Sequence, residues 1–281
     1  MSHAALEIRH LHLALIANEK KIVQDLSFTV PCGSTVALVG ESGSGKTMTS
    51  MAVMGLLPRD IRQTGGSIFI EEKDVGGISS EQYRQLRNTK VSIVMQNPMS
   101  AFNPILNIYA HFWETLASHD TNDHRAIRKR ANELLNDVGF SDPASILELY
   151  PFQMSGGMLQ RVMLALALIY SPPLIIADEA TSDLDVFSQA HILRILKEHC
   201  LKRRSALLLI THDLSVAAAL ADEVVLIKEG RLIEQGDISS FFRTPQTSYA
   251  KQLLKSHQGL YTAEYLKIQN TLAAGHLGGS A

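Results

Sequence analysis

The chain has 281 residues with 26 basic and 28 acidic side chains, a net charge of −2, so it lacks the basic excess typical of nucleic-acid-binding proteins. Hydrophobic residues make up 46% and charged residues 19%, which describes an ordinary globular protein rather than a disordered or fibrous one. The length fits one large α/β domain with a sub-domain, and we expect no nucleic-acid partner.

No segment has the features of a membrane span or a secretory leader. The longest uninterrupted apolar run, Val162 to Tyr170, is too short to cross a bilayer. The N-terminus lacks the basic-then-apolar layout of a signal peptide. The two cysteines, Cys32 and Cys200, lie far apart and form no metal or disulfide spacing, which favours a reducing compartment. We therefore expect any membrane role to depend on partner proteins.

The first third of the chain predicts strands, then a strand, a loop and a helix. Leu6 to Leu15 and Ile22 to Val30 alternate apolar and polar residues, which is typical of antiparallel strands. Ser34 to Val39 is an apolar, β-branched run that predicts a buried strand. Met48 to Met54 contains neither glycine nor proline and predicts a helix.

The loop between that strand and helix fits the phosphate-loop pattern. Its members are Gly40, Glu41, Ser42, Gly43, Ser44, Gly45, Lys46 and Thr47. Glycines let backbone N–H groups face phosphate oxygens at the positive end of the next helix. Lys46 would reach the β- and γ-phosphates, and the Thr47 hydroxyl would hold Mg²⁺. A glycine-rich turn that fits by chance is the alternative, and the flanking strand and helix count against it.

The middle of the chain adds a polar strand end and a helical insertion. Thr64 to Ile70 predicts a turn and a strand, and Ser79 to Asn88 predicts a capped helix. Val91 to Met95 predicts a strand that ends at Gln96, where a side chain would point into a ligand crevice. Taken alone, an ordinary polar strand end explains Gln96 better. Helical patterns follow, and we expect a helical sub-domain over about residues 100–172.

Three further segments carry candidate functional residues. Ser155 precedes two glycines and a helix expected to reach Tyr170, a sequence that caps a helix and also suits an anion. Leu174 to Glu179 is an apolar strand ending in two carboxylates, which cost several kcal/mol when buried unless metal or hydrogen bonds compensate. Asp178 as an Mg²⁺ ligand and Glu179 as a residue polarising water would explain them. His212, after a strand at 205–210, could contact a γ-phosphate or be structural.

The last part of the chain predicts a helix from Leu214, a hairpin and a helix from Ile238. Strands at 224–228 and 231–235 are joined by Glu229 and Gly230, a two-residue hairpin signal. We expect a domain over residues 1–258 and a short C-terminal tail over 259–281.

Taken in this order, the motifs resemble the nucleotide-binding subunit of an ATP-binding-cassette (ABC) transporter over about residues 6–245. The resemblance implies an α/β fold: a P-loop NTPase core, an N-terminal antiparallel β sub-domain and an inserted helical sub-domain. The family usually has an aromatic residue near Ile16 that stacks on adenine. No Phe, Trp or Tyr occurs from Met1 to Ser27, which leaves the adenine contact unassigned.

The resemblance also implies ATP and Mg²⁺ as ligands and a role for each candidate residue. Two cassettes would close head to tail, so that Ser155, Gly156 and Gly157 contact the nucleotide on the partner's loop. The implied roles within one chain are phosphate and Mg²⁺ binding by Lys46 and Thr47, metal support by Asp178, sensing of metal and water by Gln96, catalysis by Glu179 and a γ-phosphate clamp by His212.

The implied partners are two transmembrane permease subunits, a second homologous ATPase subunit in a heterodimer and, indirectly, a substrate-binding protein. The chain would lie at the cytoplasmic face of the cell's inner membrane as a peripheral subunit. We expect the permeases to dock on the surface between Gln96 and Glu114, because it joins the γ-phosphate sensor to the exterior.

Finer features resemble the peptide and nickel import branch of the family. They are Met158 after the two glycines, the run from Gln96 to Pro104, and Pro245 followed by Tyr249. Oligopeptide-type members tend to carry a C-terminal cysteine cluster, and this chain has no cysteine after Cys200. The segments Tyr150 to Arg161, Ile176 to Glu179 and Arg62 to Gly65 look most like the first ATPase subunit of nickel importers, so the resemblance favours that subunit. A dipeptide or oligopeptide importer and, from another class, a soluble ABC ATPase outside transport are the alternatives.

Overall fold

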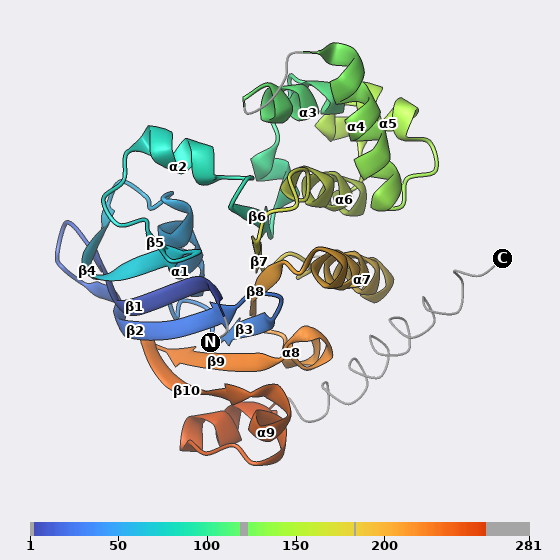
Figure 1. Cartoon of the computed structure of the whole chain (residues 1–281). Helices are drawn as coiled ribbons and strands as arrows, with labels where there is room; N and C mark the ends of the chain where they lie inside the picture. The colour runs from blue at the N-terminus through green and yellow to red at the C-terminus, as the bar shows by residue number, and fades with distance from the viewer. Residues whose placement is uncertain (1–2, 119–122, 183, 257–281) are drawn as a thin grey trace.

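Two β-sheets organise the chain, and the computed structural model describes residues 3–118, 123–182 and 184–256 (Figure 1). The first sheet is antiparallel and has the strand order β2-β1-β4-β5. Its strands are β1 (Ala4–Leu15), β2 (Lys21–Pro31), β4 (Ile61–Ile70) and β5 (Lys73–Asp74). This sheet confirms the antiparallel strands predicted from alternation, although β4 begins three residues earlier than expected.

The second sheet has the order β10-β9-β3-β8-β7-β6 and is parallel except for β10. Its strands are β3 (Thr35–Val39), β6 (Val91–Met95), β7 (Leu174–Asp178), β8 (Ala206–Thr211), β9 (Glu223–Lys228) and β10 (Arg231–Asp237). Val39 pairs with Thr211, and Asp178 pairs with both Ile210 and Met95. The carboxyl ends of β3, β8, β7 and β6 therefore meet at one edge, and the candidate residues that follow them share that edge.

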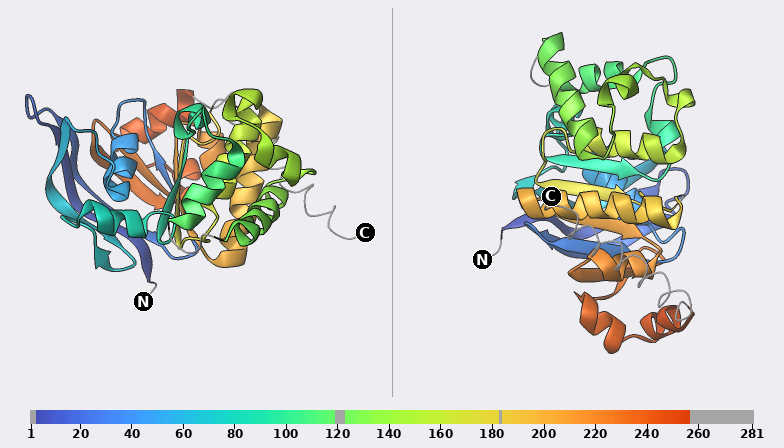
Figure 2. Two further views of the ribbon diagram at one scale, coloured as in Figure 1. Left: turned by 90° about the horizontal axis from the view of Figure 1, so that it is seen from above. Right: turned by 90° about the vertical axis from the view of Figure 1, so that its right-hand side faces the viewer.

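The helices cover the parallel sheet and extend to one side of it. They are α1 (Lys46–Met54), α2 (Ser80–Leu86), α3 (Ile108–Ala117), α4 (His124–Asp137), α5 (Pro143–Glu148), α6 (Gly156–Ala167), α7 (Val186–Arg203), α8 (Leu214–Leu220) and α9 (Ile238–Arg243), with 3-10 turns η1 (Pro98–Ala101) and η2 (Pro151–Gln153). Helices α3, α4 and α5 gather on the opposite side of the molecule from the antiparallel sheet (Figures 1 and 2). No helix within the described residues combines the length and apolar character needed to cross a membrane.

Alternate residues of the parallel strands enter different apolar clusters. Ile175 of β7 packs with α3 to α7, whereas Ile176 packs with the antiparallel sheet and α1. A smaller cluster joins Val39 and Leu226 to Phe241 of α9. Every residue of β7 and β8 is buried, as expected for parallel strands covered on both faces. The parallel sheet is therefore the middle layer of the fold, which confirms the α/β class.

One sequence expectation differs from the structure, and one helix was not predicted. Helix α6 ends at Ala167, whereas the apolar run predicted a helix to Tyr170. Leu168 and Ile169 are buried by contacts with other elements, so their apolar character does not indicate that the helix continues. The 18-residue helix α7 was not predicted at all. The expected tail at 259–281 lies outside the described residues, and the division at residue 258 stays a prediction.

Candidate nucleotide site

The loop at residues 40–45 joins the end of β3 to the start of α1. Gly45 is the N-cap of α1 and has φ 102, a left-handed conformation that favours glycine. A Cβ atom at Gly45 would also lie 3.0 Å from the carbonyl oxygen of Ile22 in β2. The buried hydroxyl of Ser44 has no hydrogen-bond partner within the described residues. The loop thus presents unpaired donors at the N-terminus of a helix, a location that suits an anion.

Lys46 folds back over this loop. Its ammonium Nζ donates to the carbonyl oxygens of Gly40 at 2.7 Å and Glu41 at 2.9 Å. Lys46 is only 4% exposed, and burial lowers its pKa, while the charges of Glu179 and Asp178 act in the opposite direction. The ammonium is therefore a buried cation held by carbonyl oxygens, and phosphate oxygens could replace those partners.

Asp178 ends β7 beneath the loop and is 5% exposed. Its carboxylate accepts a hydrogen bond from Ser50 Oγ at 2.7 Å and a longer one from Thr47 Oγ1 at 3.4 Å. Burial raises the pKa of Asp178, the Ser50 hydrogen bond opposes this rise, and the Glu179 charge adds to it. The Thr47 hydroxyl and this carboxylate form an oxygen pair of the kind that Mg²⁺ prefers.

Glu179 and His212 meet at the ends of β7 and β8. The Oε1 atom of Glu179 lies 3.2 Å from Nδ1 of His212. Glu179 has φ 49, and its N–H donates to the carbonyl oxygen of Ile210 at 2.9 Å, which fixes the turn after β7. The Glu179 side chain is 19% exposed and the His212 side chain 57%. The carboxylate is therefore sheltered, whereas the imidazole remains open to solvent.

Two cavities adjoin at this edge of the sheet and share Ser42 and Glu179. The first, of about 350 Å³, is lined by residues that include Lys46, Thr47 and Gln96. The second, of about 310 Å³, is lined by Gly40, Glu41 and His212, and by Leu253 near the end of the described chain. The structure thus brings the predicted residues of the phosphate loop together with Gln96, Glu179 and His212. The contribution of Leu253 was not predicted.

The residues 155–157 lie elsewhere. Ser155 is the N-cap of α6 and accepts from the Met158 N–H at 3.3 Å. Ser155 and Gly157 line a third cavity, of about 310 Å³, together with Met158 and Arg161. A Cβ atom at Gly156 would meet none of the described residues within 4 Å, so this helix start is open in that part of the chain. No phosphate-loop residue lines the third cavity, and within one chain these two predicted parts of the site stay apart.

Sequence reasoning missed two side chains that support the site. Ser50 contacts Asp178 as described, and its position four residues after Lys46 places both on one helix face. Gln160 is 1% exposed, and its Nε2 donates to the carbonyl oxygens of Met95 and Ala180, at 3.1 Å and 2.6 Å. It ties α6 to the end of β6 and to the residue after Glu179. The available signal was a polar residue that directly follows Leu159 on the helix and precedes the apolar run from Val162.

The residues present fit a magnesium nucleotide. The Ser44 hydroxyl, which has no partner among the described residues, and the Lys46 ammonium offer donors for phosphate. Thr47, Asp178 and Gln96 offer oxygen ligands beside the same cavity. Ile22 of β2 also lines that cavity and gives it an aliphatic wall.

Comparisons with known proteins agree with this geometry. A sequence profile of the ABC transporter family matches residues 23–182. The oligopeptide transport ATP-binding protein AppD of Bacillus subtilis is 40% identical over 258 residues, covering 89% of this chain and 77% of that protein. The dipeptide transport ATP-binding protein DppD of the same species is 40% identical over 254 residues, covering 89% of this chain and 76% of that protein.

The fold is similar to that of solved ATP-binding cassettes. The cassette MJ0796, solved as a dimer in a post-hydrolysis state bound to ADP and Pi, superposes with a TM-score of 0.74 and 23% identity, covering 83% of this chain and 98% of that one. The chain cbiO1 of Clostridium perfringens, part of the transporter complex cbiONQ, gives a TM-score of 0.73 and 22% identity, covering 94% and 98%. At this level of identity the likeness concerns the fold alone.

Proposed function

Because the chain belongs to the ABC transporter family, we propose that it is the ATP-hydrolysing subunit of an importer for short peptides. The observation that carries ATP hydrolysis is the gathering of Lys46, Thr47, Gln96 and Glu179 around one cavity. The peptide cargo is supported by AppD and DppD, which are named as oligopeptide and dipeptide transport proteins and are each 40% identical to this chain.

Nickel, which the sequence favoured as cargo, receives no support from these relatives. Both are named for peptide transport, and the alternative of a dipeptide or oligopeptide importer therefore replaces nickel as our main proposal. The second alternative, a soluble ABC ATPase outside transport, is also disfavoured by relatives that are named as transport proteins. The missing C-terminal cysteine cluster, which counted against an oligopeptide-type member, is consistent with a peptide importer whose ATPase subunit lacks that cluster.

The proposed chemistry is positioning together with charge stabilisation. ATP supplies the phosphoryl group for hydrolysis, and Mg²⁺ neutralises phosphate charge. Lys46 and the loop N–H groups would orient the phosphates, while Thr47, Asp178 and Gln96 would hold the cation. Glu179 would accept the proton of the attacking water at a carboxylate oxygen.

His212 lies 3.2 Å from Glu179 and would hold that carboxylate in place while it contacts the transferred phosphoryl group. Both side chains follow adjacent strands, so their separation is fixed by the pairing of β7 with β8. A contact of this kind, from His212 to Glu179, would keep the carboxylate within the narrow range of positions that proton transfer requires.

We further propose that the chain works at the cytoplasmic face of the membrane with two permease subunits, a homologous ATPase subunit and, indirectly, a peptide-binding protein. Within the expected docking surface, Met99 is 49% exposed and Ile105 is 78% exposed. Phe152 of η2 is 66% exposed and stacks with Tyr150. Large exposed apolar side chains favour contact with another protein.

Uptake by cells that lack this gene tests the cargo. We expect uptake of a labelled dipeptide to fall and to return with the wild-type gene, but not with Lys46→Ala. Lys73→Ala, at an exposed lysine of β5, is the matched control and should restore uptake. Loss of radioactive nickel uptake with peptide uptake intact would overturn the peptide proposal in favour of nickel. No change in either uptake would overturn both cargoes.

Hydrolysis by the assembled transporter tests the enzyme proposal separately. We expect Glu179→Gln to keep ATP binding and to lower turnover by about 100-fold or more, the range seen when a general base is lost. The matched control is Glu72→Gln, because the Glu72 side chain is 67% exposed and pairs only with His3 among the described residues. Equal turnover of Glu179→Gln and wild type would sink the assignment of Glu179.

A further inference from the structure

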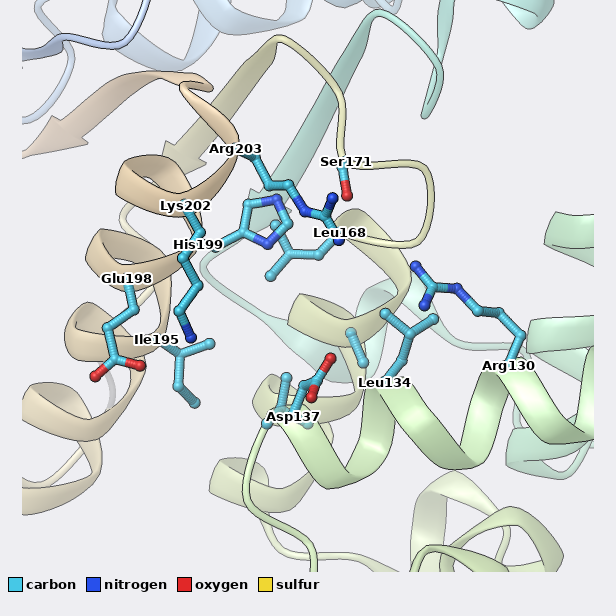
Figure 3. Close-up of a pocket in the computed structure, with 12 residues that line it drawn as sticks. Arg130, Leu134, Asp137, Leu168, Ser171, Ile195, Glu198, His199, Lys202 and Arg203 are labelled. Atoms are coloured by element: carbon cyan, nitrogen blue, oxygen red, sulfur yellow. The ribbon is translucent and has the colours of Figure 1, made fainter. Parts of the chain in front are cut away.

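A cavity of about 160 Å³ lies away from the nucleotide site, where α4, the end of α6 and the last turns of α7 meet (Figure 3). Its floor is apolar and includes Leu134, Leu168 and Ile195. Its rim is charged and includes Lys202 and Arg203. The cavity therefore joins the helical layer of α4 to the helix that covers the parallel sheet, and no step of the proposed hydrolysis uses it.

Two cations on the rim of this cavity lack an ion-pair partner among the described residues. Lys202 and Arg203 form no ion pair with any carboxylate of the described residues. Arg130 uses one guanidinium nitrogen on Glu133, at 3.5 Å, and another on the carbonyl oxygen of Ile169, at 3.1 Å. Asp137 of α4 and Glu198 of α7 are the acids that line the same cavity. Three cations and two acids thus line the cavity, and Lys202 and Arg203 are the cations left without an ion pair among the described residues.

His199 adds a buried nitrogen to the wall. Its Nε2 atom is buried and has no hydrogen-bond partner within the described chain. Burial, together with the charges of Arg203, Lys202 and Arg130, lowers the pKa of His199 to about 4, while Asp137 acts in the opposite direction. The ring is therefore neutral at pH 7, and its buried nitrogen costs free energy unless something pairs with it.

We propose that this cavity binds a phosphate group, either inorganic phosphate or the phosphoryl end of a small metabolite. Phosphate carries more charge than a single carboxylate and accepts hydrogen bonds in several directions, which suits the rim cations Lys202 and Arg203. The hollow is smaller than the 300–1,000 Å³ typical of sites for larger ligands, so it fits a phosphoryl head rather than a whole nucleotide.

The location gives such a ligand a structural effect. Asp137 and Arg130 belong to α4, whereas His199, Lys202 and Arg203 belong to α7. A phosphate held between them would link the helical layer to the layer that covers the sheet. It would also replace repulsion between Arg130 and the α7 cations by attraction to a shared anion.

The test uses the full chain carrying Lys46→Ala, so that phosphate binding at the phosphate loop is weakened. Histidine labelled with ¹⁵N is titrated by NMR in sodium phosphate and in sodium chloride at equal ionic strength, with His199→Phe to assign the resonance. We expect the His199 midpoint to rise by about one pH unit or more in phosphate, because a nearby anion favours the charged ring. Superimposable titration curves in the two salts would overturn the proposal.

Calorimetry with matched variants locates the site. Replacing both rim cations, Lys202→Met with Arg203→Met, should weaken binding of inorganic phosphate at least tenfold. Lys197→Met, at an exposed lysine on the same helix, should leave it unchanged. If the double variant does not fold, as judged by circular dichroism, Lys202→Met alone takes its place, with a loss of threefold or more expected. Equal affinity of wild type and the rim variant would contradict the proposal.

Two further ligands distinguish inorganic phosphate from a phosphorylated metabolite as the occupant of the cavity. Tighter binding of glycerol 3-phosphate than of inorganic phosphate would indicate a phosphorylated metabolite, and the reverse order would indicate the free ion. Both results support a phosphate site. Binding of citrate without binding of either phosphate probe would overturn the assignment of ligand class.

Discussion

Asp178 is a residue at which stability and the proposed function oppose each other. Burial raises its pKa, so the folded state binds a proton at this carboxyl more tightly than the unfolded state does. Its contribution to stability is present below the unfolded pKa and is lost as the pH rises through the raised folded pKa. At neutral pH the ionised carboxylate is therefore a net cost, which Ser50 and Thr47 reduce by hydrogen bonding.

We expect Asp178→Asn to stabilise the nucleotide-free chain at pH 7 by about 0.5–2 kcal/mol, the range of single stabilising substitutions at functional sites. Asparagine keeps an acceptor for Ser50 without the buried charge. The gain should shrink as the pH falls through the raised pKa of Asp178, because the wild-type side chain then also becomes neutral. Urea unfolding of both proteins at several pH values without Mg²⁺ measures the difference in their free energies of unfolding.

Asp60→Asn is the control for this substitution, since Asp60 is exposed in the turn before β4. It should change the free energy of unfolding little at any of these pH values. A lower stability of Asp178→Asn at pH 7 would mean that the carboxylate is already compensated without a cation.

Among the elements, the hairpin of β9 and β10 does more than close the sheet. Its turn has positive φ at both residues, 50° at Glu229 and 76° at Gly230, as a type I′ turn requires. The Gly230 N–H donates to the carbonyl oxygen of Ser44 at 3.0 Å, and the Gly230 carbonyl accepts from the Gln24 N–H at 2.7 Å. The hairpin tip thus fastens the phosphate loop to β2.

Gly230→Ala should therefore damage both stability and nucleotide binding. A Cβ atom there would lie 2.2 Å from the carbonyl oxygen of Ile22, so backbone must move at the tip. We expect a loss of about 1–3 kcal/mol in the free energy of unfolding, the usual cost of overpacking, and weaker binding of a fluorescent ATP analogue.

The same hairpin offers a control in Gly236, where a Cβ atom would meet nothing within 4 Å. Gly236→Ala should match wild type in denaturant unfolding and in nucleotide titration. If both alanine variants behaved alike, the contact of the tip with the phosphate loop would be unimportant.

Local patterns predicted most of the elements, because each was marked by adjacent residues. The hairpin turn and the strand–loop–helix around Lys46 are of this kind. Helix α7 could also have been found, since the buried residues Ala190, Leu193, Leu196 and Cys200 recur at helical spacing. The end of α6 could not have been predicted from the sequence. Leu168 and Ile169 are apolar because they pack in the core beyond the helix, so the apolar run continues past the last helical residue.

The candidate site was predictable where strand ends carry polar residues and unpredictable where support comes from distant segments. Ser50 and Asp178 are 128 positions apart, and Gln160 reaches Met95 across 65. Neither contact has a signature in adjacent residues. Likewise, the hairpin signal at Glu229 and Gly230 gave the turn but not its contact with the phosphate loop.

On the scale of the whole molecule, the phosphate loop and the residues 155–157 open into separate cavities. Lys46 and Thr47 line one, whereas Ser155 and Gly157 line the other. A nucleotide bound at the first cavity would therefore gain contacts from a Ser155 segment only if a second cassette supplied it. This arrangement is consistent with our proposal that the chain pairs with a homologous ATPase subunit.

Ser155→Arg tests whether the Ser155 segment contacts the nucleotide bound to a second chain. In the isolated chain we expect ATP affinity to stay within about twofold of wild type, because Ser155 lies outside the cavity of Lys46. In the assembled transporter we expect hydrolysis to fall by about tenfold or more, since a bulky cation would disturb the closed interface. The substitution also removes the N-cap of α6, worth about 1 kcal/mol.

Ser79→Arg is the control, because it removes the corresponding cap of α2 and should leave hydrolysis unchanged. Isothermal titration of the isolated chain and phosphate release by the assembled transporter measure the two effects. If Ser155→Arg weakened ATP binding by the isolated chain as strongly as Lys46→Ala, the segment would act within its own chain, and the two-chain site would be wrong.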